Sequence, residues 1–192
     1  MRISGGTAKG RPTATQRLLE KTSDGERLRP TSSKVREALF DIIRSRIDGA
    51  AFVDLYAGTG TVGLEALSRG AGTAIFVEPD KLRADTISKN MDKFGFRDRA
   101  IVIRGYAAEF ISKASAKNDR YDIFFIDPPY QSDEIEKVMP MIDEKGLLSD
   151  NGLLIVEHFF KKKLPETFER LKLLKQYKYG DTMLTLYGKV KT

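Results

Sequence analysis

A carboxylate, two prolines and an aromatic ring directly follow a short apolar run. Asp127, Pro128, Pro129 and Tyr130 come after residues 123–126. The apolar run is typical of a buried parallel strand, which proline cannot continue, so Asp127 is expected at the carboxyl end of a strand, where open α/β sheets bind ligands. The Asp127 carboxylate and the Pro128 carbonyl would offer two acceptors beside the Tyr130 ring, which suits a planar ring that bears an amino group. The alternative is a strand-ending turn with an exposed aspartate.

A second candidate site follows the first predicted strand, residues 51–56. Gly58, Gly60 and Gly63 lie between this strand and a predicted helix. The order strand, glycine turn, helix is that of nucleotide-cofactor loops. Glu78 closes the next predicted strand 20 residues after Gly58, at a place where a carboxylate can accept hydrogen bonds from ribose hydroxyls.

The nature of this cofactor depends on Asp54. Residues 58–63 match the pattern GxGxxG, so a dinucleotide such as NAD(P) is one interpretation. Asp54 lies four residues before Gly58, and its charge would be poorly placed beside a pyrophosphate. The chain also has no recognisable hydride-transfer constellation. Both points favour a cofactor with a cation and an amino group near Asp54, which S-adenosylmethionine provides. The alternative is that local backbone amides satisfy the Asp54 carboxylate.

Composition and charge limit the classes of protein and partner. The 192 residues contain no cysteine and one histidine, His158, so a metal site built on these residue types is not expected. No membrane span or signal peptide is recognisable, which favours a soluble, cytoplasmic protein. The net charge is +6; residues 1–46 hold 11 Lys and Arg against 5 Asp and Glu, and the remainder holds 22 of each. A basic N-terminal arm predicts a polyanionic partner, although a solvated tail is the alternative.

The order of predicted elements indicates the fold class. Strands alternate with helices, and two alternating runs at residues 170–178 and 182–188 predict a terminal hairpin. The result is an α/β fold with a mostly parallel sheet and an antiparallel edge. After Pro30, Thr31 or Ser32 should cap a helix whose basic side chains lie off its apolar stripe. The lysine run at residues 161–163 is expected in a solvated loop.

The chain resembles a known family along its whole length. Residues 54–60 (DLYAGTG), Glu78 and residues 127–130 (DPPY) are similar to the Rossmann-like, S-adenosylmethionine-dependent methyltransferases that modify exocyclic amino groups. Residues 1–11 (MRISGGTAKGR), 29–40 (RPTSSKVREALF) and 63–71 (GLEALSRGA) look like signatures of the RsmD family within that class. Those enzymes methylate N2 of a guanine in bacterial small-subunit (16S) ribosomal RNA.

The resemblance implies a fold and a division of the chain. The fold would be that of a Rossmann-like class I methyltransferase, with a mostly parallel seven-stranded sheet, an antiparallel C-terminal hairpin and a small N-terminal basic β-hairpin or arm. Residues 1–30 would form the arm for RNA, and residues 31–192 the methyltransferase domain. The partner would be 16S rRNA, within a small ribosomal subunit or its assembly intermediate, and no metal or membrane would take part.

The resemblance also implies roles for individual residues. Catalysis would use Asp127, Pro128 and Tyr130. S-adenosylmethionine would contact Asp54, Ala57, Gly58, Thr59, Gly60, Glu78, Pro79, Tyr106 and Ala107, and the RNA would contact Arg2, Lys9, Arg11, Arg29, Thr31, Lys34 and Arg36. At the end of the third strand the wider class often has Asp or Asn, whereas this chain has Tyr106, so adenine recognition there would use backbone groups or ring stacking. The rival functions are a DNA adenine-N6 methyltransferase, a non-catalytic rRNA-binding assembly factor and a dehydrogenase.

Overall fold

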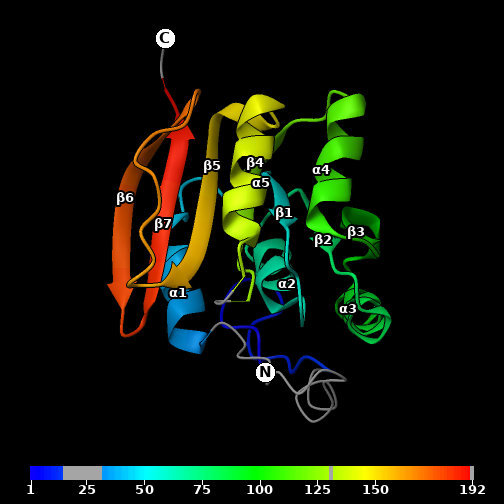
Figure 1. Cartoon of the computed structure of the whole chain (residues 1–192). Coiled ribbons are helices and arrows are strands. Elements are labelled where there is room, and N and C mark those ends of the chain that lie inside the picture. The colour runs from blue at the N-terminus through cyan, green and yellow to red at the C-terminus, as the bar shows by residue number, and fades with distance from the viewer. Residues whose placement is uncertain (15–31, 130–131, 191–192) are drawn as a thin grey trace. The chain divides into compact units, whose positions relative to one another are not determined.

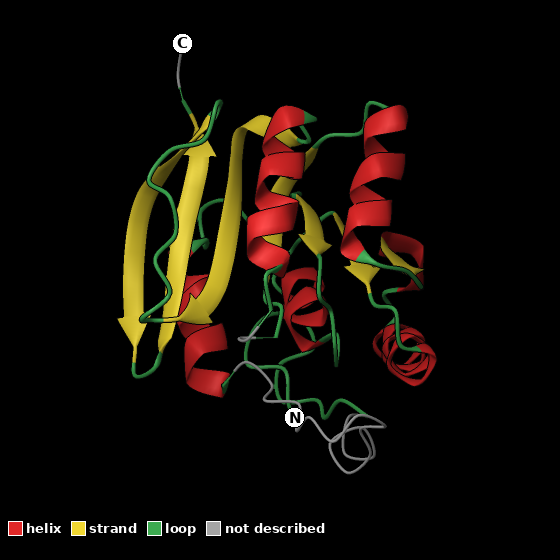
Figure 2. Cartoon of the chain, viewed as in Figure 1, coloured by secondary structure: helices red, strands yellow, loops and turns green. Residues whose placement is uncertain are grey.

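The computed structural model describes residues 1–14, 32–129 and 132–190. The chain has a mixed α/β fold with a seven-stranded, mostly parallel sheet whose C-terminal strands are antiparallel (Figures 1 and 2). It divides into two compact units, residues 1–105 and 106–192. None of the helices in the described ranges has the length and apolar character that a membrane span requires.

The first unit is built around three parallel strands in the order β3-β2-β1. Phe52 faces Ala74 across β1 and β2, and Phe76 faces Val102 across β2 and β3. The elements in chain order are α1 (Ser33–Ile42), β1 (Ala51–Asp54), α2 (Thr61–Ser68), β2 (Thr73–Val77), α3 (Lys81–Phe94), the short helix η2 (Arg97–Arg99) and β3 (Ala100–Ile103).

Two helix boundaries in this unit follow from local chemistry. Ser32 caps α1, because its hydroxyl accepts a hydrogen bond from the Val35 amide at 3.2 Å, as one of the two residues expected for that role. Gly95 ends α3 in the left-handed conformation, with φ at 73°, which a side chain would disfavour. Both boundaries agree with the sequence.

The described part of the N-terminal segment, residues 1–14, packs on the first unit. Arg2 and Pro12 form an isolated antiparallel bridge, so the expected hairpin is present in minimal form. Ile3 and Ala8 are buried in one cluster with side chains of β2, α2 and α3. Gly6 makes this approach possible, because a Cβ on it would lie 1.7 Å from the Ser68 carbonyl oxygen. The segment is therefore part of the core of this unit.

The second unit is built around four strands in the order β4-β5-β7-β6. The elements are α4 (Ala107–Ala116), β4 (Tyr121–Ile126), α5 (Glu134–Glu144), β5 (Leu148–Phe159), β6 (Leu171–Tyr179) and β7 (Thr182–Lys189). β4 and β5 run parallel, with Ile126 beside Val156, and β7 is antiparallel to both β5 and β6. In Figure 1, α4 and α5 lie side by side. The predicted terminal hairpin is confirmed, with its turn at residues 180–181.

Candidate active site

The glycine loop between β1 and α2 is shaped by its neighbours. Gly60 stands at the N-cap position of α2 with φ at 70°, and a Cβ on it would lie 2.6 Å from the Ile87 side chain. A Cβ on Gly63 would lie 2.3 Å from the Phe76 ring. Side chains at either position would push α2 away from α3 and β2. These glycines therefore let the loop and the first turn of α2 sit close against the sheet.

Gly58 and Glu78 face each other across this loop. The Glu78 carboxylate accepts a hydrogen bond from the Gly58 amide at 2.8 Å through one oxygen, and from the Asp80 amide at 3.0 Å through the other. A Cβ on Gly58 would meet no atom closer than 3.9 Å, so the loop has room for a ligand there. A carboxylate has about four lone-pair sites, and Glu78 can accept further hydrogen bonds while it holds the loop.

The ionisation of Glu78 is affected mainly by burial. Desolvation raises the pKa of this carboxyl above its ordinary value, against the opposing effects of the Asp80 amide and the Arg83 guanidinium. Arg83 lies 3.7 Å from the carboxylate. The loop therefore holds a desolvated acceptor, and hydrogen bonds from hydroxyl groups would favour its charged form.

Asp54 ends β1 in a buried position, 2% exposed. One of its carboxylate oxygens accepts a hydrogen bond from the Gly63 amide at 3.0 Å. Local backbone therefore satisfies part of this carboxylate, as the second of the two interpretations of Asp54 proposed. Its contact with the amino group of a cofactor stays a prediction.

The other predicted cofactor residues lie at element boundaries. Ala57 is buried, and its amide donates to the Val77 carbonyl at 3.0 Å. Thr59 is buried with its hydroxyl 2.8 Å from that of Thr61. Pro79 is exposed between β2 and α3. In the second unit, Tyr106 precedes α4 with its side chain 66% exposed, and Ala107 begins that helix and is buried.

The Asp127 region lies, as expected, directly after β4. Asp127 is half-buried, Pro128 is buried and Pro129 is exposed, whereas Tyr130 lies outside the described residues. The Ser132 amide and hydroxyl both donate to the Pro129 carbonyl oxygen, at 3.0 and 2.8 Å. The segment that leaves the strand is thus closed into a turn, which leaves Asp127 at the carboxyl end of a parallel strand.

Lys162 supports this turn, which sequence reasoning missed. Its ammonium group donates to the Ser132 carbonyl oxygen at 3.1 Å and forms an ion pair with Glu136 at 2.9 Å. The expectation of a solvated loop for residues 161–163 overlooked this contact. The Glu136 position on an acidic helix was the available signal, but only the fold brings the two residues together.

The charged residues of the N-terminal part differ in their environment. The predicted RNA contacts Arg2, Lys9, Arg11 and Lys34 are exposed, whereas Arg29 and Thr31 lie outside the described residues. Arg36 requires a correction, because its side chain is only 1% exposed and pairs with Glu65 at 2.9 Å. A buried guanidinium cannot contact a phosphate, so Arg36 has a structural role.

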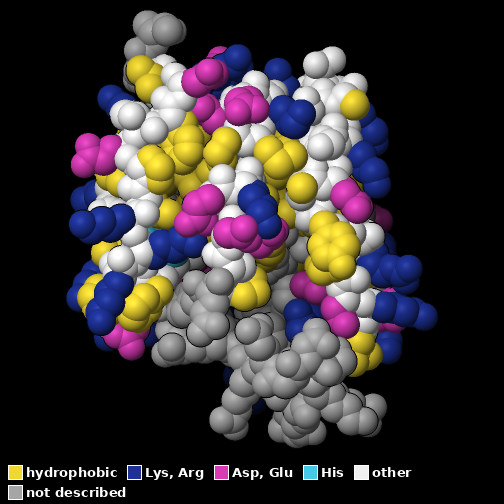
Figure 3. Space-filling view, in the orientation of Figure 1, with side chains coloured by type: hydrophobic (Ala, Val, Ile, Leu, Met, Phe, Trp, Pro, Cys, Tyr) yellow, Lys and Arg dark blue, Asp and Glu magenta, His cyan; other side chains and the backbone are white. Residues whose placement is uncertain are grey.

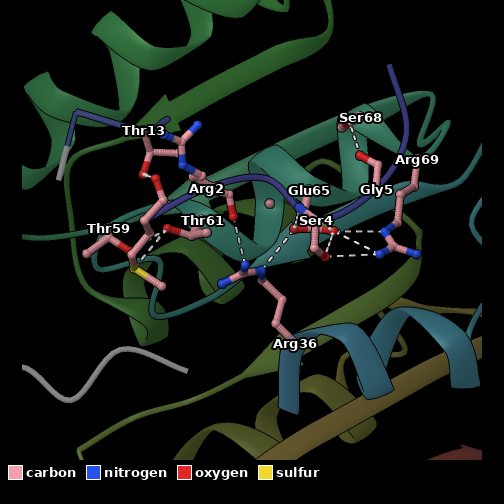
Figure 4. A network of polar contacts seen from close by, with 12 residues as sticks. Arg2, Ser4, Gly5, Thr13, Arg36, Thr59, Thr61, Glu65, Ser68 and Arg69 are labelled. Atoms are coloured by element: carbon pink, nitrogen blue, oxygen red, sulfur yellow. Dashed lines mark hydrogen bonds and ion pairs between the residues drawn. The ribbon is translucent and has the colours of Figure 1, made fainter. Parts of the chain in front are cut away.

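Arg36 belongs to a buried network around Glu65 (Figure 4). The Glu65 carboxylate also accepts hydrogen bonds from the Ser4 amide and hydroxyl and from Arg69. Burial on its own would raise the pKa of Glu65, but the Ser4 hydrogen bonds and the positive charge of Arg36 hold it below its ordinary value. Arg36 also donates to the Arg2 carbonyl at 2.8 Å. This network fastens the N-terminal segment to α1 and α2.

The single histidine takes no part in these sites. His158 is buried in β5, with Nδ1 2.9 Å from the Phe159 carbonyl oxygen and Nε2 2.8 Å from the Thr185 hydroxyl. Because a carbonyl only accepts, Nδ1 carries the proton and Nε2 accepts from Thr185. Burial lowers the pKa of this imidazole, so it stays neutral. Within the described residues, no group of three or more His, Asp or Glu side chains is arranged to hold a metal ion.

Comparison with known proteins places these features in a wider group. The family model described as conserved hypothetical protein 95 matches residues 1–188. The chain is 31% identical to the ribosomal RNA small subunit methyltransferase D of Escherichia coli, over 97% of this chain and 89% of that protein. It is 33% identical to the protein of the same name from Haemophilus influenzae, over 85% and 84%. A solved structure of a hypothetical protein from Thermus thermophilus is 30% identical, with a TM-score of 0.80 over 99% of both chains.

Proposed function

The chain belongs to the family described as conserved hypothetical protein 95, which is the RsmD family, and we propose that it transfers a methyl group from S-adenosylmethionine to the exocyclic N2 of a guanine in 16S ribosomal RNA. The observation that carries the proposal is the position of Asp127, half-buried at the carboxyl end of β4 and followed by the buried Pro128. Relatives of nearly full length that are named for small-subunit rRNA methylation support it.

The residues of the Asp127 turn would act on the guanine. Its N2 lone pair is delocalised into the ring, which makes the amine a poor nucleophile. We infer that the Asp127 carboxylate and the Pro128 carbonyl accept its two N–H bonds, so that the nitrogen is held in one orientation and its lone pair can localise. Tyr130 would stack on the base, a contact that contributes roughly 1–3 kcal/mol. The guanine must be unstacked from its neighbours to reach these groups.

The glycine loop would bind the cofactor. Glu78 would accept hydrogen bonds from the two ribose hydroxyls, and Asp54 would attract the amino group and the sulfonium charge. The open space at Gly58 lets a ligand approach the loop backbone. Ala57, Thr59 and Gly60 would contact the same ligand, with Pro79, Tyr106 and Ala107 near the adenosine. When bound, S-adenosylmethionine supplies the methyl group, and its C–S bond breaks as the N–C bond forms and an amine proton passes to solvent.

The RNA would be bound through its phosphates by exposed basic residues of the N-terminal segment. Arg2, Lys9, Arg11 and Lys34 are exposed, and Arg29 and Thr31 stay in this set as sequence-based predictions. Such contacts position the RNA without reading its sequence. We propose that the substrate is 16S rRNA within a small subunit or its assembly intermediate, in the cytoplasm.

Methyl transfer to ribosomal particles tests the function directly. Small subunits from cells that lack the protein are incubated with the enzyme and radiolabelled S-adenosylmethionine, and the modified nucleoside is identified by mass spectrometry. We expect label in 16S rRNA as N2-methylguanosine. Label in DNA adenine, or none in any nucleic acid while the protein still binds RNA, would replace the proposal by one of its rivals.

We expect the substitution Glu78→Ala to weaken S-adenosylmethionine binding roughly 30- to 100-fold, because hydrogen bonds to a charged group contribute about 1.5–3 kcal/mol. Isothermal titration calorimetry measures the dissociation constant, and thermal unfolding checks that the protein is folded. Asp98→Asn is the control, since Asp98 is an exposed acid of the same unit outside the loop. An unchanged dissociation constant in Glu78→Ala would contradict the assignment.

A further inference from the structure

The distribution of charge contains a second basic region. Residues 160–192 hold nine Lys and Arg against three Asp and Glu, whereas residues 47–159 hold 13 against 19. The balanced charge after residue 46 therefore conceals an acidic middle and a basic C-terminal region. The excess of six positive charges in that region equals the excess in residues 1–46.

The fold concentrates part of this charge around aromatic rings. We call the side chains of Phe160, Lys161, Lys163, Lys175, Tyr177 and Lys178 the lysine–aromatic patch. The Lys178 ammonium lies 3.9 Å from the centre of the Phe160 ring, and that of Lys161 lies 5.8 Å from the same point. Lys175 lies 5.1 Å from the Tyr177 ring. In Figure 3, Lys and Arg side chains alternate with hydrophobic ones over β6 and β7, at the left of the view.

Two simpler explanations cover only part of these contacts. β6 is the edge strand, and lysines on an edge prevent pairing with other chains. That function needs no rings beneath the ammonium groups. Acidic side chains do not explain the lysines either, because no ion pair joins Lys161, Lys163, Lys175 or Lys178 to an acid in the described part of the chain. The positive charge is available to an external anion.

The patch lies at the same end of the sheet as Asp127. β4 and β5 are parallel with Ile126 beside Val156, so Asp127 and the residues after Phe159 leave the sheet at one edge. The Phe160 amide donates to the Asp181 carbonyl at 3.0 Å, which places the β6–β7 turn there too. Lys162, between two members of the patch, donates to Ser132 of the Asp127 turn at 3.1 Å. A polymer held at Asp127 can therefore reach the patch.

We propose that the lysine–aromatic patch is a second RNA-binding surface, which holds nucleotides that flank the target guanine. Phe160 and Tyr177 would stack on unpaired bases while the four lysines contact phosphates. Basic grooves that combine ammonium groups with aromatic rings are the common solution for single-stranded nucleic acid, since every base has a face on which a ring can stack. The identity of the RNA as ribosomal rests on the proposed function; the surface itself does not.

The test measures RNA binding by the full chain without catalysis. The double variant Lys175→Gln/Lys178→Gln is compared with Lys113→Gln/Lys117→Gln, which loses the same charge from the exposed surface of the same unit where α4 leads into the start of β4. Fluorescence anisotropy gives the affinity for a single-stranded RNA of mixed sequence over a range of KCl concentrations. We expect the slope of log affinity against log salt to fall by about 2 in the patch variant, about 1 for each lost phosphate contact.

A second variant isolates the stacking contribution. We expect Phe160→Leu to bind single-stranded RNA roughly 5- to 100-fold more weakly, with a smaller loss for a duplex RNA whose bases are paired. Binding of S-adenosylmethionine and the melting temperature should stay unchanged in both variants. An unchanged salt slope, an equal loss in the control, or a loss only of binding to phosphatidylglycerol vesicles would overturn the proposal. If the wild type binds RNA through the patch but does not methylate rRNA, the proposed function fails and this surface stands.

Discussion

Alanine in place of Asp127 should abolish detectable methyl transfer while the protein still binds S-adenosylmethionine. Loss of one preorganised acceptor at a reacting group typically costs 10²- to 10³-fold in kcat. Asp127 is expected to hold both the position and the charge of the amine nitrogen, so we expect a reduction of at least roughly 10³-fold. Single-turnover transfer to small subunits measures the rate, and calorimetry measures cofactor binding.

Two controls separate chemistry from folding in this experiment. Asp127→Asn keeps an oxygen acceptor but loses the charge, and we expect an intermediate rate. Asp133→Ala removes an exposed carboxylate at the start of α5, where it pairs with Lys137 at 2.8 Å, and should leave the rate near that of the wild type. Turnover of Asp127→Ala within tenfold of the wild type would show that this carboxylate does not hold the amine.

The substitution Arg36→Met should lower the free energy of unfolding by about 3–5 kcal/mol. Glu65 is fully buried, and removal of its guanidinium partner leaves a charge without its main compensation. Methionine fills a comparable volume, so the loss would come from charge and hydrogen bonds. Denaturant unfolding at neutral pH measures the change. We also expect faster proteolysis within residues 1–14, because Arg36 holds the Arg2 carbonyl.

Arg97→Met provides the matched control for this loss. Arg97 pairs with Asp92 at 2.7 Å, but both side chains are 55% exposed, so the cost should stay within about 1 kcal/mol. The pH dependence gives a further check. Because the pKa of Glu65 is held below its ordinary value of 4.5, its contribution is present above that pH and is lost as the pH falls through the lowered value. The difference between wild type and Arg36→Met should therefore shrink in acid.

The anchoring of residues 1–14 changes how an RNA-binding arm should be tested. A truncation of the arm would remove Ile3 and Ala8 from the core and leave Glu65 without the Ser4 hydrogen bonds. Lost RNA binding in such a truncation would then report damage to the first unit. Single substitutions of exposed residues, such as Lys9→Gln, test the phosphate contacts without that complication.

The sequence by itself determined the parallel fold, its antiparallel hairpin and the positions of the glycine loop and the Asp127 turn. These features follow from local rules: apolar runs form strands, proline ends them, and glycine permits the tight loop between β1 and α2. The helix caps at Ser32 and Gly95 were readable for the same reason, since each depends on a few neighbouring residues.

Only the tertiary structure decided which charged residues are buried and which are exposed. Arg36 and Lys34 stand two positions apart on one helix, but Arg36 is enclosed because Glu65, 29 residues later, supplies its counter-charge. Lys162 likewise leaves solvent for Ser132 and Glu136, whereas Lys178 lies against Phe160. A lysine or arginine has no local pattern that distinguishes these environments, because its partner is chosen by the packing of segments that are distant in the sequence.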